Sequence, residues 1–512
     1  GLTMPPMGTM KLGRSRSFSA ARKLVAFAAA SFAAMLILAA PASAQKLVTI
    51  DASSDYVDPS NQHLAGPVTE NMGPHPGKLM ANVLLPDGYT PKKRYPLLLL
   101  LHGSGERFDS WADPLLGDIR NTAKDLNAVI VMPEGAQGFY TDWWNEGERS
   151  DPAWEDYIRE SLLPMIQSRF SIRPERRYHA IAGFSMGGYG TWLTASQLPG
   201  FFGTAVPLSA FASIRTFEST LAFATAAGGT PYAQVYGDPT GFYAEGHDPI
   251  ALGPNLAFTN LDVFTGDGEP DPEVRPQNDP SNPGYVTDGD GVSLYLESVL
   301  KTQNDAAVAA MEASGNKNVD YTVHKGSHDW EFWRPDLKAA IAKGLFRPTP
   351  ARPANWSYRT AASEGQAWDI YFNFSPAPTA VTTFKRTGNR LKVTGEGEMT
   401  IFDGNGCSFS ADLPFTRTLS EKPCRSLKLQ AKGGGLRKGR TGTITVTVKG
   451  MNYTGVTKPV DAVKVEAGGA SAITAYNGKA TLKVKPKQSG KLTVKVAKDG
   501  FRPASAKLNV RK

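Results

Sequence analysis

The feature that most restricts the fold is an alternation of apolar runs and helix-like segments along residues 46–345. Each apolar run ends at or next to a turn that contains glycine. The runs are PLLLLLHG (96–103), NAVIVMPEG (127–135), YHAIAGFS (178–185), GTAVPLSA (203–210) and LDVFTGDG (261–268). Between them lie segments of helical character, such as WEDYIRESLLPMIQSRF (154–170) and YGTWLTASQL (189–198). Strands that are apolar on both faces and separated by helices are typical of a parallel sheet covered on both sides. The sequence therefore predicts an α/β fold with a mostly parallel sheet, which we assign to residues 45–346.

The chain after residue 346 follows a different pattern. RPTPARPAN (347–355) is rich in proline and is interpreted as a linker. Short alternating runs such as AWDIYFNF predict a small all-β domain over 356–425, and runs such as TITVTVKG predict a basic immunoglobulin-like β domain over 426–512. The stretch GGGLRKGRTG (433–442) is interpreted as a flexible join. A length of 512 residues agrees with several domains.

Residues 1–44 have the pattern of a secretory signal peptide. Five basic residues between 11 and 23 precede the apolar run LVAFAAASFAAMLILAA (24–40), and Ala-Ser-Ala at 42–44 fits a cleavage site before Gln45. The alternative is a transmembrane anchor, because the apolar run is nearly long enough to span a bilayer. The cleavage motif favours removal, which leaves no membrane span. No twin-arginine pair precedes the run, so we expect Sec-dependent export of a secreted or envelope-associated protein.

The two cysteines are expected to pair with each other. Cys407 and Cys424 enclose a short loop in a chain predicted to be exported, a setting that favours one disulfide. A zinc site is not expected, since two thiols without nearby histidines are too few ligands. No other metal and no cofactor is predicted.

The positive charge is concentrated at the end of the chain. The net charge is +8, and residues 426–512 hold nineteen lysines and arginines against three acidic residues. A nucleic-acid partner is not expected, because this segment has neither a recognised motif nor interleaved aromatic residues. An anionic polymer of the cell envelope or a lipid head group is the predicted partner. The alternative is a lysine-rich domain that only spaces the rest of the protein.

A serine between glycines follows one of the predicted strands. GFSMG (183–187) fits G-x-S-x-G, in which the serine occupies a strained turn between a strand and a helix. The apolar YHAIA before it and the helix-like GYGTWLTASQL after it supply that context. We therefore predict that Ser185 is a nucleophile, with a purely structural turn as the alternative.

A serine nucleophile requires a base, and in α/β-hydrolases the chain order is serine, acid, histidine. Of the seven histidines, His247, His324 and His328 follow the serine. His247 lies in a Pro/Gly-rich stretch with no strand before it, and His324 lies inside the strand-like YTVHKG. His328 lies in the loop after that run and before a predicted helix, which is the position expected for the base.

Two acidic residues compete for the third position of the triad. Asp267 follows the predicted strand LDVFTG, where a hydrolase acid usually lies. Glu297 lies in GVSLYLESVLKTQNDAAVAAMEASG, a predicted amphipathic helix, where periodicity alone suggests a solvated residue. The residue pattern by itself favours Asp267.

Two backbone N–H groups are candidates for an oxyanion hole. One belongs to Met186, directly after the serine, and the other to the loop LLHGSGERFDSW, where Ser104 is the predicted donor. His102 in the same loop and Trp330, two residues after His328, are predicted substrate contacts. Core packing is the alternative for the aromatic residue.

Four motifs together resemble a family of secreted esterases that includes actinobacterial mycolyltransferases and S-formylglutathione hydrolase. They are LLHGSGERFDSW, VMPEGAQGFYTDWWN, AGFSMGGYG and GSHDWEFW, and the resemblance covers about 80–345. It implies an α/β-hydrolase fold and a serine-dependent acyl-enzyme. In the mycolyltransferases the acid is a helical glutamate about thirty residues before the histidine. Here Glu297 and His328 are 31 residues apart, so the resemblance implies Glu297, with Asp267 as the alternative.

The first of these motifs departs from the mycolyltransferases. Their oxyanion loop carries an Asp and an Arg that hold trehalose, whereas this chain has His-Gly-Ser-Gly at 102–105. The departure leaves two hypotheses open: acyl transfer as in mycolyltransferases, and hydrolysis of acetyl or feruloyl esters of carbohydrates. A third hypothesis, of another class, is a non-catalytic envelope-binding protein or adhesin that keeps the hydrolase fold.

Overall fold

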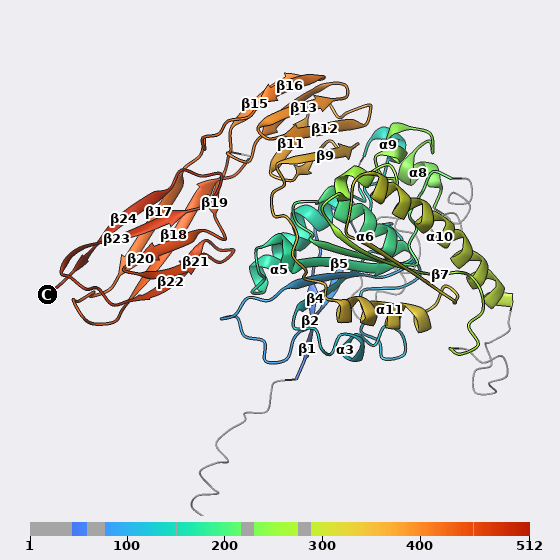
Figure 1. The fold of residues 1–512 in the computed structure, drawn as a ribbon, viewed down its shortest axis with the longest axis horizontal. Coiled ribbons are helices and arrows are strands. Elements are labelled where there is room, and N and C mark those ends of the chain that lie inside the picture. The colour runs from blue at the N-terminus through green and yellow to red at the C-terminus, as the bar shows by residue number, and fades with distance from the viewer. Residues whose placement is uncertain (1–43, 59–76, 150, 217–229, 275–287, 454) are drawn as a thin grey trace, which may run out of the picture. The chain divides into compact units, whose positions relative to one another are not determined.

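The computed structural model describes residues 44–58, 77–149, 151–216, 230–274, 288–453 and 455–512. The first part of the chain (Figure 1) is built on one sheet, which has eight strands. The strand order is β1-β2-β4-β3-β5-β6-β7-β8. The strands are β1 (Lys46–Asp51), β2 (Met80–Leu85), β3 (Leu97–Leu101), β4 (Val129–Pro133), β5 (His179–Phe184), β6 (Thr204–Leu208), β7 (Asn260–Gly266) and β8 (Val319–His324). Strands β1, β2 and β4 pair antiparallel, and the pairs from β4 to β8 are parallel. The predicted mostly parallel sheet is confirmed.

Helices cover both faces of this sheet (Figure 1). The α-helices are α3 (Ile119–Thr122), α4 (Trp154–Asp156), α5 (Leu163–Arg169), α6 (Met186–Gln197), α8 (Tyr232–Tyr236), α9 (Phe242–Glu245), α10 (Asp288–Ala313) and α11 (Trp330–Lys343). The short helices of other types are η1 (Asn145–Gly147), η2 (Tyr157–Leu162), η3 (Arg176–Tyr178) and η4 (Gly253–Leu256). This arrangement is the α/β-hydrolase fold that the motifs implied.

The run of five leucines in β3 shows why the strands are apolar throughout. Leu97, Leu99 and Leu101 join a core shared with α5, α6 and α10. Leu98 and Leu100 join a second core shared with α3 and α11. Successive side chains of a strand point to opposite faces, so a strand covered on both sides is apolar at every position.

Two all-β domains follow, each with two antiparallel sheets around its own core. The first has the sheets β10-β11-β14-β15 and β16-β13-β12-β9. Its strands are β9 (Asn355–Thr360), β10 (Glu364–Ala367), β11 (Ile370–Phe374), β12 (Thr382–Thr387), β13 (Arg390–Thr394), β14 (Glu398–Phe402), β15 (Ser408–Asp412) and β16 (Phe415–Thr418). The alternation of buried and exposed residues along these strands agrees with the predicted two-residue period.

The second all-β domain packs the sheet β17-β18-β19, with β22 also paired to β18, against the sheet β21-β20-β23-β24. Its strands are β17 (Leu427–Gly433), β18 (Gly442–Met451), β19 (Thr457–Pro459), β20 (Lys464–Ala467), β21 (Ala470–Ile473), β22 (Lys479–Val484), β23 (Gly490–Ala497) and β24 (Ala504–Val510). The prediction of 433–442 as a flexible join is wrong, because this stretch connects the paired strands β17 and β18. Its Leu436 is buried in the domain core, which holds the connection in place.

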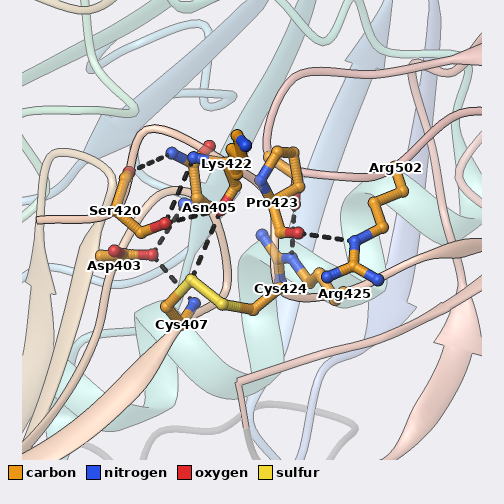
Figure 2. The surroundings of a disulfide bond; sticks show 10 residues. Asp403, Asn405, Cys407, Ser420, Lys422, Pro423, Cys424, Arg425 and Arg502 are labelled. Carbon is orange, nitrogen blue, oxygen red and sulfur yellow. Dashed lines mark hydrogen bonds between the residues drawn. A yellow bond between two sulfur atoms is a disulfide. The ribbon is translucent and has the colours of Figure 1, made fainter.

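Cys407, in the connection between β14 and β15, and Cys424, in the segment after β16, form the predicted disulfide (Figure 2). The Asp403 carboxylate accepts hydrogen bonds from the backbone N–H groups of Asn405 and Cys407, both at 2.9 Å. The backbone N–H of Cys424 in turn donates to the Asn405 carbonyl oxygen at 2.9 Å. Figure 2 also shows Arg502 of the next domain donating to the Pro423 carbonyl oxygen. The disulfide therefore closes a loop that is already ordered by backbone hydrogen bonds.

Removing this disulfide is expected to destabilise the all-β part of the chain. The two cysteines are 17 residues apart, and a loop of that length restricts the unfolded chain by about 3 kcal/mol. A Cys407→Ser/Cys424→Ser variant should therefore lose about this much free energy of unfolding in urea, followed by far-UV circular dichroism. Dithiothreitol should shift the original protein in the same direction and leave the variant unchanged. Equal stability of the two proteins without reductant would contradict the prediction.

Within the described ranges, none of the helices combines the length and the apolar character needed to cross a membrane. The predicted signal peptide, apart from its last residue, lies outside the described residues.

Candidate active site

Ser185 occupies a sharp turn between β5 and α6. Its backbone has φ 55° and ψ −120°, a conformation that residues other than glycine rarely adopt. A Cβ at Gly183 would lie 2.5 Å from the Gly187 carbonyl oxygen, and a Cβ at Gly187 would lie 2.5 Å from the His102 carbonyl oxygen. Both glycines of the motif are therefore required by close backbone contacts. The turn holds Ser185 at the carboxyl end of β5, with 6% of its surface exposed.

His328 and Glu297 are brought together from distant parts of the chain. His328 lies in the loop between β8 and α11, and Glu297 lies in α10. The His328 Nδ1 and the Glu297 Oε2 are 2.7 Å apart, which is a hydrogen bond between a ring nitrogen and a carboxylate. The glutamate is 0% exposed and the histidine side chain 9% exposed. The pair is therefore almost completely shielded from water, and a hydrogen bond in such an environment is stronger than in water.

The second carboxylate oxygen of Glu297 is held by three donors. Oε1 accepts hydrogen bonds from the Ser209 hydroxyl at 2.7 Å and the Thr265 hydroxyl at 3.0 Å. It also accepts the backbone N–H of Gly266 at 2.6 Å. A buried carboxylate requires such partners to remain charged. These donors fix the carboxylate so that Oε2 faces the histidine.

Contacts on two sides bring Ser185 to the same end of the sheet as this pair. The backbone N–H of Ser185 donates to the Leu208 carbonyl oxygen at 3.0 Å. Ser209, which follows Leu208 in the chain, donates its hydroxyl to the Glu297 carboxylate. On the other side, Trp333 of α11 stacks on Phe184 with a centroid distance of 4.1 Å. The same tryptophan lies edge-on to the His328 ring at 4.9 Å. The structure therefore gathers the predicted serine, histidine and glutamate at the carboxyl edge of the sheet.

The two other histidines that follow the serine are held by different acids. His324 Nε2 lies 3.0 Å from the Asp336 carboxylate. Burial lowers the pKa of His324, but the hydrogen bond and charge of Asp336 outweigh it and raise the pKa to about 9. A histidine that is already protonated at neutral pH cannot act as a base. His247 is buried, with Nε2 3.0 Å from Glu155 Oε1.

Asp267, the alternative acid, takes part in a local turn. Its carboxylate accepts the backbone N–H of Glu269 at 2.8 Å, and its own N–H donates to the His324 carbonyl oxygen at 2.8 Å. These contacts hold the Asp267 carboxylate in the turn after β7. Sequence periodicity preferred this residue, whereas the hydrogen bonding of His328 agrees with the glutamate that the family resemblance implied.

The loop after β3 brings Ser104 and Met186 into the same region. Met186 is the first residue of α6, and the first N–H groups of a helix have no partner within the helix. Gly103 packs so closely on the Phe184 ring that a Cβ there would overlap it. The Ser104 hydroxyl donates to Gln137 Oε1 at 2.8 Å. The backbone of this loop is therefore packed against the turn that carries the predicted nucleophile.

His102 occupies a different place from the predicted substrate contact. Its side chain is 1% exposed, with Nδ1 2.8 Å from the Gly103 carbonyl oxygen and Nε2 3.2 Å from Glu134 Oε1. Burial lowers the pKa of His102, but the hydrogen bond and charge of Glu134 outweigh it and raise the pKa overall. Both ring nitrogens contact groups inside the protein, so the buried His102 side chain helps to hold the loop in place. The prediction that it contacts substrate is not supported by this placement.

Trp330 is also more buried than a substrate wall. The side chain is 7% exposed, and its Nε1 donates to Glu106 Oε1 at 3.2 Å. Its ring packs edge-on against Trp111 and Phe184, with centroid distances of 4.9 and 4.5 Å. Trp330 therefore joins α11 to the loop after β3, and the core alternative describes it better than the predicted substrate contact.

The residue pattern by itself did not single out the segment that braces the loop after β3. Glu134, directly after β4, accepts backbone N–H groups from Ala136 at 2.8 Å and Phe108 at 3.3 Å. Burial raises the pKa of Glu134, but the hydrogen bonds from His102 and these backbone groups lower it overall. The Tyr140 hydroxyl contacts both the N–H and the carbonyl oxygen of His102, at 3.1 and 3.0 Å. The only sequence signal for these residues was the motif VMPEGAQGFYTDWWN.

Known proteins resemble this chain over its first part. Esterase Rv1288 of Mycobacterium tuberculosis is 38% identical over 151 residues, which cover 29% of this chain and 32% of that protein. Diacylglycerol acyltransferase/mycolyltransferase Ag85B of Mycobacterium leprae is 27% identical over 221 residues, 41% of this chain and 63% of that protein. The chain thus spans about a third of the first relative and less than two thirds of the second. The solved structure of M. tuberculosis MPT51 has a TM-score of 0.42 and 20% identity, covering 52% of this chain and 93% of MPT51.

A protein-family model covers the same part of the chain. The model of the Esterase family, described as "Putative esterase", matches residues 75–343, more than half of the sequence. These residues contain the elbow serine, the His328–Glu297 pair and the braced loop after β3. The resemblance that the four motifs indicated is confirmed, and the protein belongs to this esterase family.

Proposed function

We propose that this protein is a serine ester hydrolase or acyltransferase with Ser185 as nucleophile, His328 as base and Glu297 as acid. The observation that carries the proposal is the 2.7 Å hydrogen bond between His328 Nδ1 and the fully buried Glu297 carboxylate. It lies at the end of the sheet where the strained turn holds the serine. A base oriented by an acid, beside a nucleophile at an elbow, is the arrangement that acyl transfer requires.

The reaction follows from these contacts. With its Nδ1–H donated to Glu297, His328 takes the Ser185 proton on Nε2 while the serine oxygen attacks the ester carbonyl. The backbone N–H groups of Met186 and Ser104 stabilise the oxyanion that forms. The tetrahedral intermediate expels the alcohol, which receives the proton from His328, and an acyl-enzyme remains. Water or a second alcohol then attacks the acyl carbon, and the same histidine accepts its proton and returns it to the serine.

The substrate class we propose is an acylated carbohydrate or lipid. Support comes from the relatives, one named as a diacylglycerol acyltransferase/mycolyltransferase and another, of Xylanibacter ruminicola, as an endo-1,4-beta-xylanase/feruloyl esterase that is 31% identical over 138 residues. The sequence HGSG after β3 differs from the sugar-holding residues of the mycolyltransferases. Hydrolysis and transfer to a sugar therefore remain the two outcomes to distinguish.

The first experiment separates an enzyme from a binding protein that keeps the fold. A fluorophosphonate probe reacts only with an activated serine, and peptide mass spectrometry should locate it on Ser185. Prior reaction with a p-nitrophenyl ester in excess should reduce the labelling. An intact chain without label would support the alternative of a non-catalytic adhesin and contradict the proposal.

The second experiment identifies the acceptor. The protein is incubated with a long-chain acyl ester, with and without trehalose, and the products are analysed by mass spectrometry. An acyl trehalose would establish transfer, and free acid alone would establish hydrolysis. A feruloylated arabinose ester in parallel tests the carbohydrate-esterase alternative.

We also propose that the protein is exported and that residues 1–44 are removed. The support is the basic, apolar and Ala-Ser-Ala order of the N-terminal residues, together with the disulfide in the described part. N-terminal sequencing of the mature protein should give Gln45 as the first residue. A mature chain that retains the apolar run would contradict cleavage.

Glu134 is expected to affect turnover through the loop that it braces. Glu134→Gln keeps the size of the side chain but removes the charge opposite His102, so the backbone from 102 to 104 should lose its fixed position. We expect kcat to fall by about 10-fold to 100-fold with KM changed less than about threefold, because an oxyanion contact acts mainly in the transition state.

The matched control for this prediction is Glu155→Gln. Glu155 is likewise buried and pairs with a histidine, His247, at 3.0 Å. Both variants remove a buried Glu–His pair, so both should lower the free energy of unfolding. Only Glu134→Gln should lower kcat at equal KM. Equal kinetic effects in the two variants would show that the His102–Glu134 pair is purely structural.

A further inference from the structure

The second all-β domain has one outward face built from threonines and lysines. Along β18, the buried residues Ile444, Val446 and Val448 alternate with Thr443, Thr445 and Thr447. Neighbouring residues of a strand point to opposite sides of the sheet, so the three threonines form a column on the outer face. Along this middle strand of the sheet, Thr443 and Thr445 are exposed and Thr447 is half-buried.

Lysines flank the threonine column on both sides. Lys432 of β17 lies opposite Thr445, and Lys428 on the same strand lies opposite Lys449. On the other side, β22 places Lys479 opposite Thr447.

The same register places Lys483 opposite Thr443. All four flanking lysines are exposed. We call the three threonines and these four lysines the lysine–threonine face.

The positive charge of this face is not balanced by the acids of its own domain. The three acidic residues of 426–512 are Asp461, Glu466 and Asp499. Asp461 lies 3.1 Å from Lys498, and Glu466 lies 2.5 Å from Lys464 on the opposite sheet.

The third acid, Asp499, lies 4.0 Å from Arg352. Lys428 and Lys449 lie directly opposite each other, and like charges in such positions repel. An anionic ligand on this face would remove that repulsion.

The shape of the face fits a linear ligand. Threonine side chains are short and lysine side chains are long. The threonine column is therefore the bottom of a shallow groove, with a row of ammonium groups on each side. Adjacent strands are about 4.8 Å apart, which places the two lysine rows about 10 Å from each other. Within each row the lysines are four residues apart, or about 13 Å. A single polymer chain lying along β18 would meet cations on both sides and hydroxyl donors beneath.

We propose that the lysine–threonine face binds a linear anionic polymer along β18. A membrane surface fits less well, because interfacial binding combines attraction to anionic lipids with apolar side chains that enter the bilayer, and only the first of these is available on this face. The middle strand of this face presents threonines at the three positions between its lysine rows. The face is separate from the candidate active site, so this inference does not rest on the proposed catalytic function.

A single negative charge added to the lysine–threonine face tests whether the polymer binds along β18. Thr445→Glu places a carboxylate in the centre of the threonine column, between the lysine rows. Ser505→Glu is the matched control, because Ser505 is exposed on β24 of the opposite sheet and faces Lys495. Both variants change the net charge equally. With long-chain polyphosphate as probe, we expect Thr445→Glu to weaken binding of the full chain by about tenfold and Ser505→Glu by less than threefold.

Removal of lysines supplies the complementary test. Lys432→Gln/Lys479→Gln/Lys483→Gln should reduce polyphosphate binding much more than Lys491→Gln/Lys495→Gln/Lys507→Gln, which removes three charges from the opposite sheet. Binding should also decline steeply with added salt, since exposed charges are screened within about 10 Å at 0.1 M. Turnover of a short p-nitrophenyl ester and the urea midpoint should stay the same in all variants.

Three results would overturn the proposal. Equal losses in the two triple variants would show that only total charge matters. Binding to phosphatidylglycerol vesicles but not to polyphosphate would assign the face to a membrane. Absence of polyphosphate binding at low ionic strength, by a folded chain that still hydrolyses the ester, would show a solvated face without this ligand.

Discussion

Ser185→Ala is expected to reduce ester hydrolysis by at least about 10⁴-fold, as loss of a triad nucleophile does in other serine hydrolases. The substitution removes only the hydroxyl oxygen, and alanine has the same Cβ at the strained turn as serine. The hydrogen bond from this residue's N–H to Leu208 is made by the backbone and should remain. The free energy of unfolding should therefore stay within about 1 kcal/mol of the original value.

Turnover of a short p-nitrophenyl ester measures this effect, and urea denaturation checks the fold. Ser168→Ala serves as control, because Ser168 is exposed on α5 and its hydroxyl bonds only locally, to the Met165 carbonyl oxygen at 2.7 Å. This variant should keep its rate. Unchanged turnover in Ser185→Ala, in a protein of confirmed sequence, would end the assignment of the nucleophile.

Glu297→Gln is expected to reduce kcat by about 10³-fold to 10⁴-fold. The glutamine oxygen would keep the three donors that now bind Oε1, which turns its NH₂ group toward His328 Nδ1. Nδ1 would then have to accept a hydrogen bond, and the ring proton would move to Nε2. In that tautomer the histidine cannot take the serine proton, which is the known effect of replacing a triad carboxylate by an amide.

Asp267→Asn is the control for this variant. Its carboxylate accepts one backbone N–H in a local turn, and an asparagine oxygen can accept the same bond. Its kcat should therefore change less than about threefold. Full activity in Glu297→Gln, together with a large loss in Asp267→Asn, would transfer the role of acid to Asp267.

Local patterns were sufficient to predict the α/β fold and the turn at Ser185. Strand β3 is apolar at each position, and β5 is buried at each position, because helices cover both faces of the sheet; this leaves a direct mark on the sequence. The glycines at 183 and 187 likewise mark close backbone contacts. His328 could be singled out because it follows a predicted strand and precedes a predicted helix.

The acid could not be chosen from local patterns. Glu297 lies on α10, and periodicity alone predicts that a charged residue of an amphipathic helix is solvated. Its burial arises because Ser209, Thr265 and Gly266, from the ends of β6 and β7, surround one side of it. Such a contact joins elements that are far apart in the chain, so periodicity carries no signal for it.

The sequence by itself determined the alternation of apolar strands and helices that gives the α/β fold, the elbow at Ser185, the pairing of the two cysteines and the excess of lysines at the end of the chain. Each of these follows from residues close together in the chain or from composition. Only the tertiary structure decided that Glu297 binds His328, that His102 and Trp330 are buried, and that lysines of β17 and β22 flank one column of threonines. These features depend on which elements pack together, and packing selects among side chains that look alike in the sequence.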